Sequence, residues 1–241
     1  MGLIASLKNS FRKEQFIPSW VSVIINSNYF LSRGISSGIK KNAHYMNGTM
    51  LDFGCGRKPY ASLFNVKNHI GIDIENPEYK NDNIIDKIFD GKTIPYENNY
   101  FDSVFCSEVL THIFDAEDMV PELTRVLKPE GHMLITVPFA WKENQIPNDS
   151  ARYTSFGIKH LLEKNGFEIV SQQKSGHYFL VVVQFMNDFI YSSLFPNIKI
   201  LKLLLTILFI FPINLMALIF SLILPKNKDL FHTNIIVARK K

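Results

Sequence analysis

The sequence predicts an α/β protein built on a mostly parallel sheet, and three observations lead to that prediction. Short apolar segments that end in glycine or in an acidic residue recur along the chain from Thr49 onward. Amphipathic segments of helical length separate them, as crossover connections between parallel strands require. The chain has 241 residues, of which 46% are hydrophobic and 20% charged, and this balance excludes disordered, collagenous and coiled-coil proteins.

The expected strands cover residues 49–53, 69–73, 84–90, 101–106, 132–137, 167–170 and 233–239. Two helices are expected between them, at 116–127 and 155–164. The first should stop at the Lys-Pro-Glu-Gly run 128–131, and the second should be capped by Ser155 and end at Asn165–Gly166. Before Thr49 the sequence has no strand signal. Leu3, Leu7 and Phe11 recur there at helical spacing, so we expect a helical lead-in over 1–48.

Informative residues follow four of these strands. In an open α/β sheet ligands bind beyond the carboxyl ends of the strands. Glycines after the first strand allow a ligand to approach the backbone closely. An acidic residue about twenty positions later can accept hydrogen bonds from the hydroxyl groups of a ribose. Position 59 is Pro59, so the chain lacks the Gly-x-Gly-x-x-Gly pattern of dinucleotide sites, and NAD is disfavoured. The informative residues are Gly54 and Gly56, then Asp73, then Asp90, then Ser107 with Glu108.

Taken in order, these segments resemble the class I S-adenosylmethionine-dependent methyltransferases. The run 51–56, Leu-Asp-Phe-Gly-Cys-Gly, is similar to their first motif, and Gly71-Ile72-Asp73 to their second. Residues 94–112 and 125–131 resemble the corresponding stretches of the type 11 branch. The resemblance covers roughly residues 49–171 and the last strand. It implies a Rossmann-like sheet whose last strand is antiparallel and lies between the fifth and the sixth.

The resemblance also implies the cofactor, S-adenosylmethionine, and the residues that bind it. Gly54 and Gly56 would flank its methionine part, Asp52 would lie beneath that loop, and Asp73 would hold the ribose. Lys58 stands where many members have a third glycine, and this departure puts the geometry of the loop in question. The cofactor-binding set predicted in this way is Asp52, Gly54, Cys55, Gly56, Asp73, Asp90, Ser107 and Glu108.

His112 is the candidate general base, because a hydroxyl acceptor needs a group that takes its proton near neutral pH. A purely structural histidine in the helix after the fourth strand explains the residue equally well. Glu108 and His112 are four residues apart, so they would share one helical face and could approach a metal ion. The place where some quinone-biosynthesis relatives have a further acid is Thr111, and we therefore expect no bound metal.

Arg152 and Tyr153 are the candidate acceptor-binding residues. They lie in the stretch 141–156, between the fifth strand and the next helix, where acceptor loops usually sit in this family. The Arg-Tyr-Thr segment resembles one found in a branch often encoded with cell-surface glycan synthesis. An arginine can clamp a phosphate or carboxylate bidentately, although a surface ion pair is the alternative.

An apolar segment interrupts the domain before its last strand. Only three charged residues fall between Tyr178 and Pro225, and Leu203–Leu224 has none over 22 residues, enough to cross a bilayer. If the sixth and last strands share one sheet, the chain must return to the side that it left. Two topologies satisfy this condition: a monotopic hairpin turning at Pro212, which we favour, and two full crossings. An apolar cap or a dimer interface is a further alternative.

The expected organisation is a lead-in at 1–48, a methyltransferase domain at 49–176 completed by 232–241, and a membrane-associating insertion at 177–231. We expect O-methylation of a membrane-resident or lipid-linked glycan acceptor at the cytoplasmic face of a membrane, so the expected partners are a small-molecule or lipid-linked acceptor and the membrane surface. A quinone or lipid-headgroup methyltransferase is the alternative, and a non-catalytic membrane scaffold is the alternative of a different class. The net charge of +4 is too small and too scattered to predict nucleic-acid binding.

Overall fold

The computed structural model describes residues 11–76 and 84–241. These residues form two compact units. The sheet unit comprises Gly38–Lys174 and Thr233–Lys241, and the helical unit comprises the described part of Met1–Ser37 together with Ser175–His232. Each unit has a hydrophobic core of its own.

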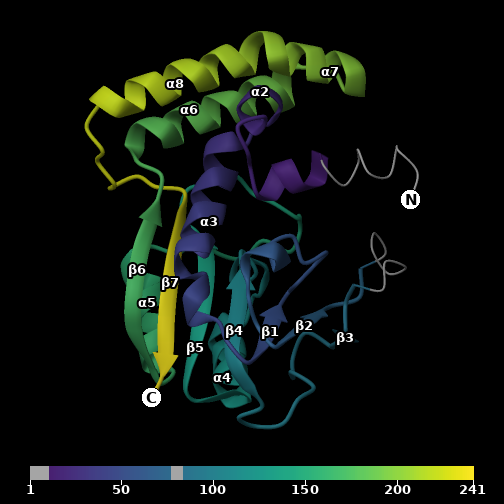
Figure 1. The fold of residues 1–241 in the computed structure, drawn as a ribbon, viewed down its shortest axis with the longest axis vertical. Helices are drawn as coiled ribbons and strands as arrows, with labels where there is room; N and C mark the ends of the chain where they lie inside the picture. The colour runs from purple at the N-terminus through teal and green to yellow at the C-terminus, as the bar shows by residue number, and fades with distance from the viewer. Residues whose placement is uncertain (1–10, 77–83) are drawn as a thin grey trace. The chain divides into compact units, whose positions relative to one another are not determined.

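The sheet unit contains one seven-stranded sheet with the order β3-β2-β1-β4-β5-β7-β6 (Figure 1). The pairs β1–β2, β2–β3, β1–β4 and β4–β5 are parallel, and β5–β7 is antiparallel. The expected fold class is therefore confirmed, including the last strand between the fifth and the sixth. The strands are β1 Thr49–Phe53, β2 Asn68–Asp73, β3 Lys87–Ile88, β4 Phe101–Ser107, β5 Leu127–Pro138, β6 Phe167–Ser175 and β7 Thr233–Lys240.

Helices cover both faces of this sheet, which explains why its central strands read as continuous apolar runs. The helices α4 (Ala116–Val126) and α5 (Ser155–Lys164) share one buried cluster with Ile236 of β7. The adjacent Ile235 points to the opposite face, because side chains alternate along a strand. There it meets the end of α3 (Tyr29–Asn42) that belongs to the sheet unit: a Cβ on Gly38 would lie 2.0 Å from the Cδ1 atom of Ile235.

Three element boundaries differ from the sequence-based expectation. The run 128–131 does not form a turn but belongs to β5, with Glu130 at φ 63°. Thr154, not Ser155, caps α5: its backbone is extended, as an N-cap requires, and its Oγ1 accepts a 3.0 Å hydrogen bond from the Gly157 amide. The third strand is only two residues long. The expected stop at Gly166, with φ 85°, is confirmed.

The helical unit contains an antiparallel pair of apolar helices that turn at residues 195–198. The first is α6 (Tyr178–Phe189) with the π-helical turn η4 (Ile190–Leu194). The second runs from Lys199 to Ile223 through α7 (Lys199–Leu205), the π-helical turn η5 (Thr206–Ile210) and α8 (Phe211–Ile223). The short helix α2 (Ser22–Ile25) and helical residues 11–16 precede this pair in the chain. Leu3 and Leu7 of the expected lead-in helix lie outside the described residues.

The expected turn at Pro212 is wrong, because the helix continues through that residue. Pro212 lies in the first turn of α8, directly after the π-helical turn η5. A proline lacks the amide hydrogen that an α-helix would use, and its ring clashes with the carbonyl of the residue four positions earlier. A π-type turn changes the local hydrogen-bond register, so a helix in an apolar environment can pass a proline without breaking.

Buried amide side chains connect the segments of the helical unit. Asn214 of α8 donates to the backbone carbonyl of Val23 at 2.9 Å and accepts from Asn187 of α6 at 2.8 Å. Gln184 of α6 donates to the Ser27 carbonyl at 2.8 Å, and its Oε1 accepts from a backbone amide of α3. All three amides are fully buried. Because a buried polar group without a partner is costly, these bonds specify which faces of the helices meet.

The loop after β1 takes three left-handed backbone conformations in alternation, at Gly54 (φ 66°), Gly56 (φ 50°) and Lys58 (φ 48°). Lys58 thus adopts the conformation that favours glycine, although it carries a side chain. Its ammonium forms an ion pair with Asp86, and its stem lies so close to Gly71 that a Cβ there would come within 2.3 Å of the Lys58 Cε. Lys58 therefore takes, at this position, a backbone conformation that a glycine would adopt readily.

Replacing Asn214 with leucine should destabilise the helical unit by about 1–3 kcal/mol, because the Asn187 amide and the Val23 carbonyl would lose a buried partner. Urea unfolding in mild detergent measures this change. The exposed neighbour Leu215→Ala is the control and should cost less than 0.5 kcal/mol or so. The double variant Asn187→Leu/Asn214→Leu should recover part of the loss. A single variant as stable as the wild type would contradict the buried network.

The backbone strain at Lys58 predicts an order of stability for two variants. Lys58→Ala loses the ion pair with Asp86 and keeps a side chain at φ 48°, whereas Lys58→Gly loses the same pair and removes the strain. The glycine variant should therefore be more stable than the alanine variant by about 1 kcal/mol. Chemical denaturation of both variants measures the difference. An alanine variant at least as stable as the glycine variant would show that the loop does not hold this conformation in solution.

Candidate functional site

The carboxyl ends of β1, β2 and β4 lie side by side, because the three strands are parallel neighbours. The loop after β1 folds onto the end of β2: the Gly54 and Cys55 amides donate to the Ile72 carbonyl at 2.9 and 3.1 Å. The Gly56 amide donates to Asp73 Oδ2 at 2.7 Å. The sheet thus brings the predicted glycine loop and the predicted ribose-binding acid into direct contact.

Gly56 leaves an open space at this edge of the sheet. A Cβ built on Gly56 would meet no atom within 4 Å, whereas one on Gly54 would come within 2.4 Å of the Val109 side chain. Gly54 is therefore required for packing, and Gly56 leaves room for a ligand close to the backbone. With the Asp73 carboxylate beside it, the loop fits a ligand that carries ribose hydroxyls.

Asp52 and Cys55 lie inside the structure, on either side of the end of β1. Asp52 is buried and accepts a hydrogen bond from His69 Nε2 at 2.8 Å. Burial raises the pKa of Asp52, and the bond to His69 opposes that shift. The Cys55 side chain packs against Gly71, and burial raises the pKa of its thiol. Asp52 is the last residue but one of β1 and Cys55 lies within the loop, and their part in cofactor binding stays a prediction.

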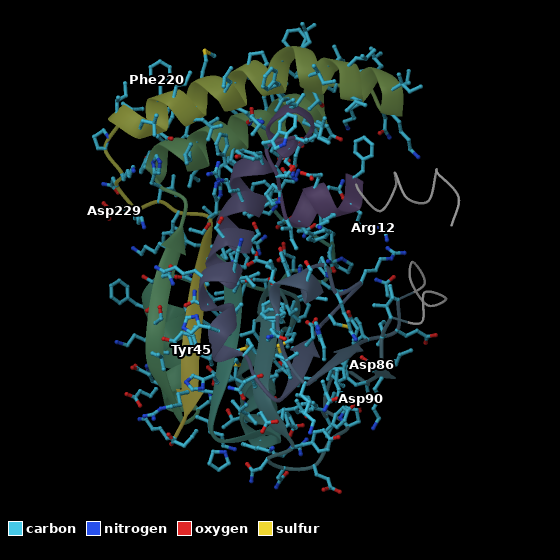
Figure 2. All side chains as sticks on the ribbon, in the orientation of Figure 1. Arg12, Tyr45, Asp86, Asp90, Phe220 and Asp229 are labelled. Carbon is cyan, nitrogen blue, oxygen red and sulfur yellow. The ribbon has the colours of Figure 1, made fainter. Side chains whose placement is uncertain are left out.

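Two acids flank the short strand β3 in sequence, Asp86 directly before it and Asp90 after it (Figure 2). Asp90 is exposed, and its Oδ1 accepts from the Lys92 and Thr93 amides at 2.8 and 2.9 Å, which lowers its pKa. Asp86 accepts from the Gly71 amide at 2.7 Å in addition to its ion pair with Lys58. We did not predict Asp86 as a site residue. Its partners are 15 and 28 positions away, so no local pattern indicates the pairing.

Glu108 follows β4 in a left-handed conformation, with φ 59°. Its amide donates to the Thr136 carbonyl at 2.9 Å, and the neighbouring Ser107 hydroxyl lies 2.9 Å from Thr136 Oγ1. The Oε1 atom of Glu108 is buried and has no hydrogen-bond partner. Burial raises the pKa of Glu108 to about 7, against a hydrogen bond from Thr136 and the positive charge of Arg152.

His112 ends the 3₁₀ turn Leu110–His112, so it shares no α-helical face with Glu108 as we had expected. Its Nδ1 lies 2.6 Å from the Asn148 carbonyl oxygen. A carbonyl only accepts hydrogen bonds, so Nδ1 carries the proton in this geometry and Nε2 of the neutral ring keeps its lone pair. Within 11–76 and 84–241, no three histidine, cysteine, aspartate or glutamate side chains are grouped to hold a metal ion.

Arg152 forms a bidentate ion pair with Asp149, with nitrogen–oxygen distances of 2.6 and 2.7 Å. Its remaining N–H groups donate to the carbonyls of Trp141, Lys142 and Ala151. An anionic acceptor would have to displace one of these partners. The acceptor role of Arg152 stays a prediction, while the contacts in the structure order the loop 141–152.

Tyr153, the other predicted acceptor residue, packs its ring against the core of the sheet unit. Its amide donates to the Pro138 carbonyl at 3.0 Å, and its own carbonyl accepts from Asn234 at 2.8 Å. Burial raises the pKa of its hydroxyl. Tyr153 therefore fixes the end of the loop to β5 and β7, and its part in acceptor binding is likewise untested.

Comparisons with known proteins agree with this geometry. Residues 51–135 match the model of the type 11 methyltransferase domain family. Phosphoethanolamine N-methyltransferase 2 of Caenorhabditis elegans is 32% identical over 114 residues, which cover 41% of this chain and 26% of the relative. The chain spans about a quarter or less of the length of the first curated relatives that it matches.

Two solved structures share the fold. Phosphoethanolamine N-methyltransferase 2 of Haemonchus contortus, solved with S-adenosylmethionine, matches 97% of this chain and 57% of its own, with a TM-score of 0.55 and 18% identity. The [4+2]-cyclase SpnF matches 86% of this chain and 79% of its own, with a TM-score of 0.54 and 16% identity. Residues 51–135 are thus a methyltransferase domain of the type 11 family, and the motifs and strand order around them are those of the class I S-adenosylmethionine-dependent methyltransferase fold.

Proposed function

We propose that this methyltransferase acts at the cytoplasmic face of a membrane, on a hydroxyl group of a lipid-linked glycan or another membrane-resident acceptor. The observation that carries the proposal is the pair of apolar helices inserted between β6 and β7. The helix Lys199–Ile223 has 25 residues and a mean hydropathy of 2.6 over its most apolar window, long and apolar enough to cross a membrane, and only 22% of that window is buried.

The topology of the insertion supports a hairpin over a single crossing. The chain leaves the sheet after Ser175 and re-enters it at Thr233. These two points are neighbours: the His232 amide donates to the Ser175 carbonyl at 2.8 Å, and β6 and β7 run in opposite directions in Figure 1. A segment that leaves and returns at one place crosses a bilayer an even number of times or not at all. The turn at residues 195–198 gives it the form of a helical hairpin.

The outer surface of this hairpin is apolar. On α6 the exposed residues Tyr178, Val182, Met186 and Phe189 recur at helical spacing. Figure 2 labels Phe220 of α8, which is 46% exposed. Exposed apolar residues that recur along a helix form a surface that suits lipid. The large exposed apolar residues of the second helix include Ile200, Leu204, Leu208, Met216, Ile219 and Leu222.

Basic residues border the apolar surface at both ends of the second helix. Lys199 and Lys202 begin it, and Lys226 and Lys228 follow it. Each lysine near an anionic bilayer contributes about 1 kcal/mol of attraction. Trp20, in the same unit, is highly exposed, and tryptophan favours the membrane–water interface. These charges and Trp20 support a hairpin that lies in the interface, with its lysines among the headgroups.

A quinone or a lipid headgroup is the second candidate acceptor. One relative is a phosphoethanolamine N-methyltransferase and another is a sterol 24-C-methyltransferase. Their names associate related domains with lipids and lipid precursors. The atoms methylated in these two names are nitrogen and carbon, not oxygen. The experiment on the acceptor therefore also has to identify which atom receives the methyl group.

S-adenosylmethionine, when bound, supplies a methyl group activated by its sulfonium. The chain then has to bind it, orient the acceptor and exclude water, since positioning provides most of the rate enhancement in such a transfer. The loop 54–56 and Asp73 would bind at the open edge of the sheet. Glu108 and His112 lie at the next strand end and turn, where a proton can be taken from the acceptor.

Replacing Gly56 with leucine should weaken binding of S-adenosylhomocysteine at least tenfold, because the new side chain would fill the open space over the loop. Isothermal titration calorimetry measures the affinity. Gly166→Leu is the matched control: that glycine also has a positive φ and open space around its Cα, but it follows α5. The control should bind like the wild type. A wild-type protein that binds no S-adenosylhomocysteine would overturn the proposed function.

The acceptor proposal predicts transfer of labelled methyl groups to membranes. Wild-type protein, methyl-labelled S-adenosylmethionine and membranes of the host cell should yield label in the lipid extract, in a form released by the mild acid hydrolysis that cleaves lipid-linked glycans. Label found in quinones or in phospholipid headgroups would show that the acceptor is the second candidate and not a glycan.

Vesicle flotation and the methyl-transfer assay together test the hairpin. The variant carries four substitutions at exposed sites, Ile200→Gln/Leu204→Gln/Leu208→Gln/Leu222→Gln. This variant should lose flotation with vesicles of 70% phosphatidylcholine and 30% phosphatidylglycerol, and it should transfer at least tenfold less label. The control variant Ile146→Gln/Phe156→Gln removes exposed apolar groups from the sheet unit and should float normally. A wild-type protein that remains in the aqueous layer without detergent would contradict the membrane proposal.

A further inference from the structure

We propose that Glu108 binds the nucleophilic group of the acceptor and takes its proton during methyl transfer. The inference rests on the proposed O-methyltransferase function and assigns its proton acceptor. It rests on the conformation of Glu108, on the unpartnered oxygen of its carboxylate and on the groups that face it.

The backbone holds Glu108 in a conformation that a residue with a side chain rarely takes. Its φ is 59°, and its amide is fixed to the Thr136 carbonyl of β5. The next residue, Val109, packs against Gly54 of the loop after β1, which leaves no space for a Cβ there. Packing on both sides thus maintains a strained residue at the ligand-binding edge of the sheet. Strain of this kind persists where the surrounding structure enforces it, and it is concentrated at functional sites.

One oxygen of the Glu108 carboxylate, Oε1, is buried and lacks a hydrogen-bond partner. Leaving such an oxygen unpaired costs about 1–3 kcal/mol, and a hydroxyl or ammonium group of a ligand would recover that cost. The charged and titratable groups that face Glu108 are Arg152 from the loop before α5, Tyr60 from the loop after β1, and Cys106 from β4. Arg152 is the one cation among these three.

Arg152 is engaged with Asp149, so its charge does not neutralise Glu108 completely. Burial therefore dominates, and it sets the pKa of Glu108 at about 7. A general base is most effective when its pKa lies near the working pH, because it is then both ionised and basic enough to accept a proton. Tyr60 is buried beside this carboxylate, and its own pKa is raised, so it stays protonated.

Methyl transfer to a hydroxyl group forms one bond, breaks one bond and releases one proton. The acceptor oxygen forms a bond to the methyl carbon, the bond from that carbon to sulfur breaks, and its electron pair returns to sulfur. The hydroxyl proton passes to Oε1 of Glu108, which becomes a neutral carboxyl group and releases the proton to solvent afterwards. No oxidant, reductant or metal ion is needed. His112, the base predicted from the sequence, is the rival, and its Nδ1 is held by the Asn148 carbonyl.

The first measurement is the titration of Glu108 itself, which needs no acceptor. In protein labelled with ¹³C at the glutamate side-chain carboxyls, one resonance should titrate near pH 7 and be absent from Glu108→Gln. Because the folded pKa is raised, ionisation destabilises the fold. The Glu108→Gln variant should therefore gain thermal stability relative to wild type as the pH rises from 4.5 through 7. A Glu108 resonance that titrates near 4.5 would overturn the inference.

The second measurement separates the acceptor from the cofactor. The family resemblance places Glu108 in the cofactor-binding set, whereas a role as proton acceptor predicts a different result. Glu108→Gln should bind S-adenosylhomocysteine within threefold of wild type, yet transfer label to membranes at least a hundredfold more slowly. The wild-type rate should rise with pH to a plateau above about 7, and Glu108→Asp should restore part of it. Glu143→Gln is the control, because it removes another carboxylate that faces Arg152 but lies exposed.

Three results would overturn the role of Glu108 and leave the proposed function standing. A tenfold or greater loss of S-adenosylhomocysteine binding in Glu108→Gln would make it a cofactor residue. Transfer by Glu108→Gln at the wild-type rate would remove it from the reaction. Loss of the pH-dependent rate in His112→Gln alone would assign the proton to His112. A wild-type protein that transfers no label would overturn the proposed function itself.

Discussion

The antiparallel strand β7, inserted between β5 and β6, constrains the rest of the molecule. It pairs with β5 over seven residue pairs from Thr233 to Arg239, deep in the sheet unit, and so it cannot be displaced without opening the core. Everything between β6 and β7 must therefore leave the sheet and return to it at one place. This condition permits an apolar hairpin and excludes a lone membrane crossing, whatever the hydropathy of the segment. The buried amides of Asn187 and Asn214 then set the pairing of the helices within that hairpin.

The parallel half of the sheet constrains the chemistry in a comparable way. Three strands that end at one edge bring together residues more than fifty positions apart, from Gly54 to Glu108. At the ends of β1 and β2, the Gly56 amide donates to Asp73 and the space above Gly56 is open. On the β4 side, a buried carboxylate oxygen has no partner. One edge thus combines an open glycine loop, an acid that suits ribose hydroxyls and, next to them, the carboxylate that we propose as the proton acceptor.

Loops in this protein keep their shapes through paired charges. Lys58 keeps a left-handed conformation with its ammonium on Asp86, and Arg152 orders the loop before α5 through Asp149. The Asp149 pKa, lowered to about 2 chiefly by the hydrogen bonds from Arg152, means that this pair holds at neutral pH. Both arrangements hold loops at the carboxyl edge of the sheet, where a binding surface has to stay in place without a regular element to support it.

The sequence by itself determined the α/β class, the glycine loop with its partner acid, and the apolar insertion. It also placed six of the seven strands, each with at least one end within one residue of the observed end. Those features depend on local periodicity and on fixed spacing, which a single chain displays directly. Only the tertiary structure decided that the hairpin turns at 195–198 instead of Pro212, because a π-helical turn accommodates the proline. It alone paired Lys58 with Asp86, engaged every donor of Arg152, and left Oε1 of Glu108 buried without a partner. The pairing of Lys58 with Asp86 joins side chains 28 positions apart, and the isolation of the Glu108 oxygen depends on the burial that folding imposes. The partners of Arg152 are near in sequence, but the conformation of the loop decides which of them it binds.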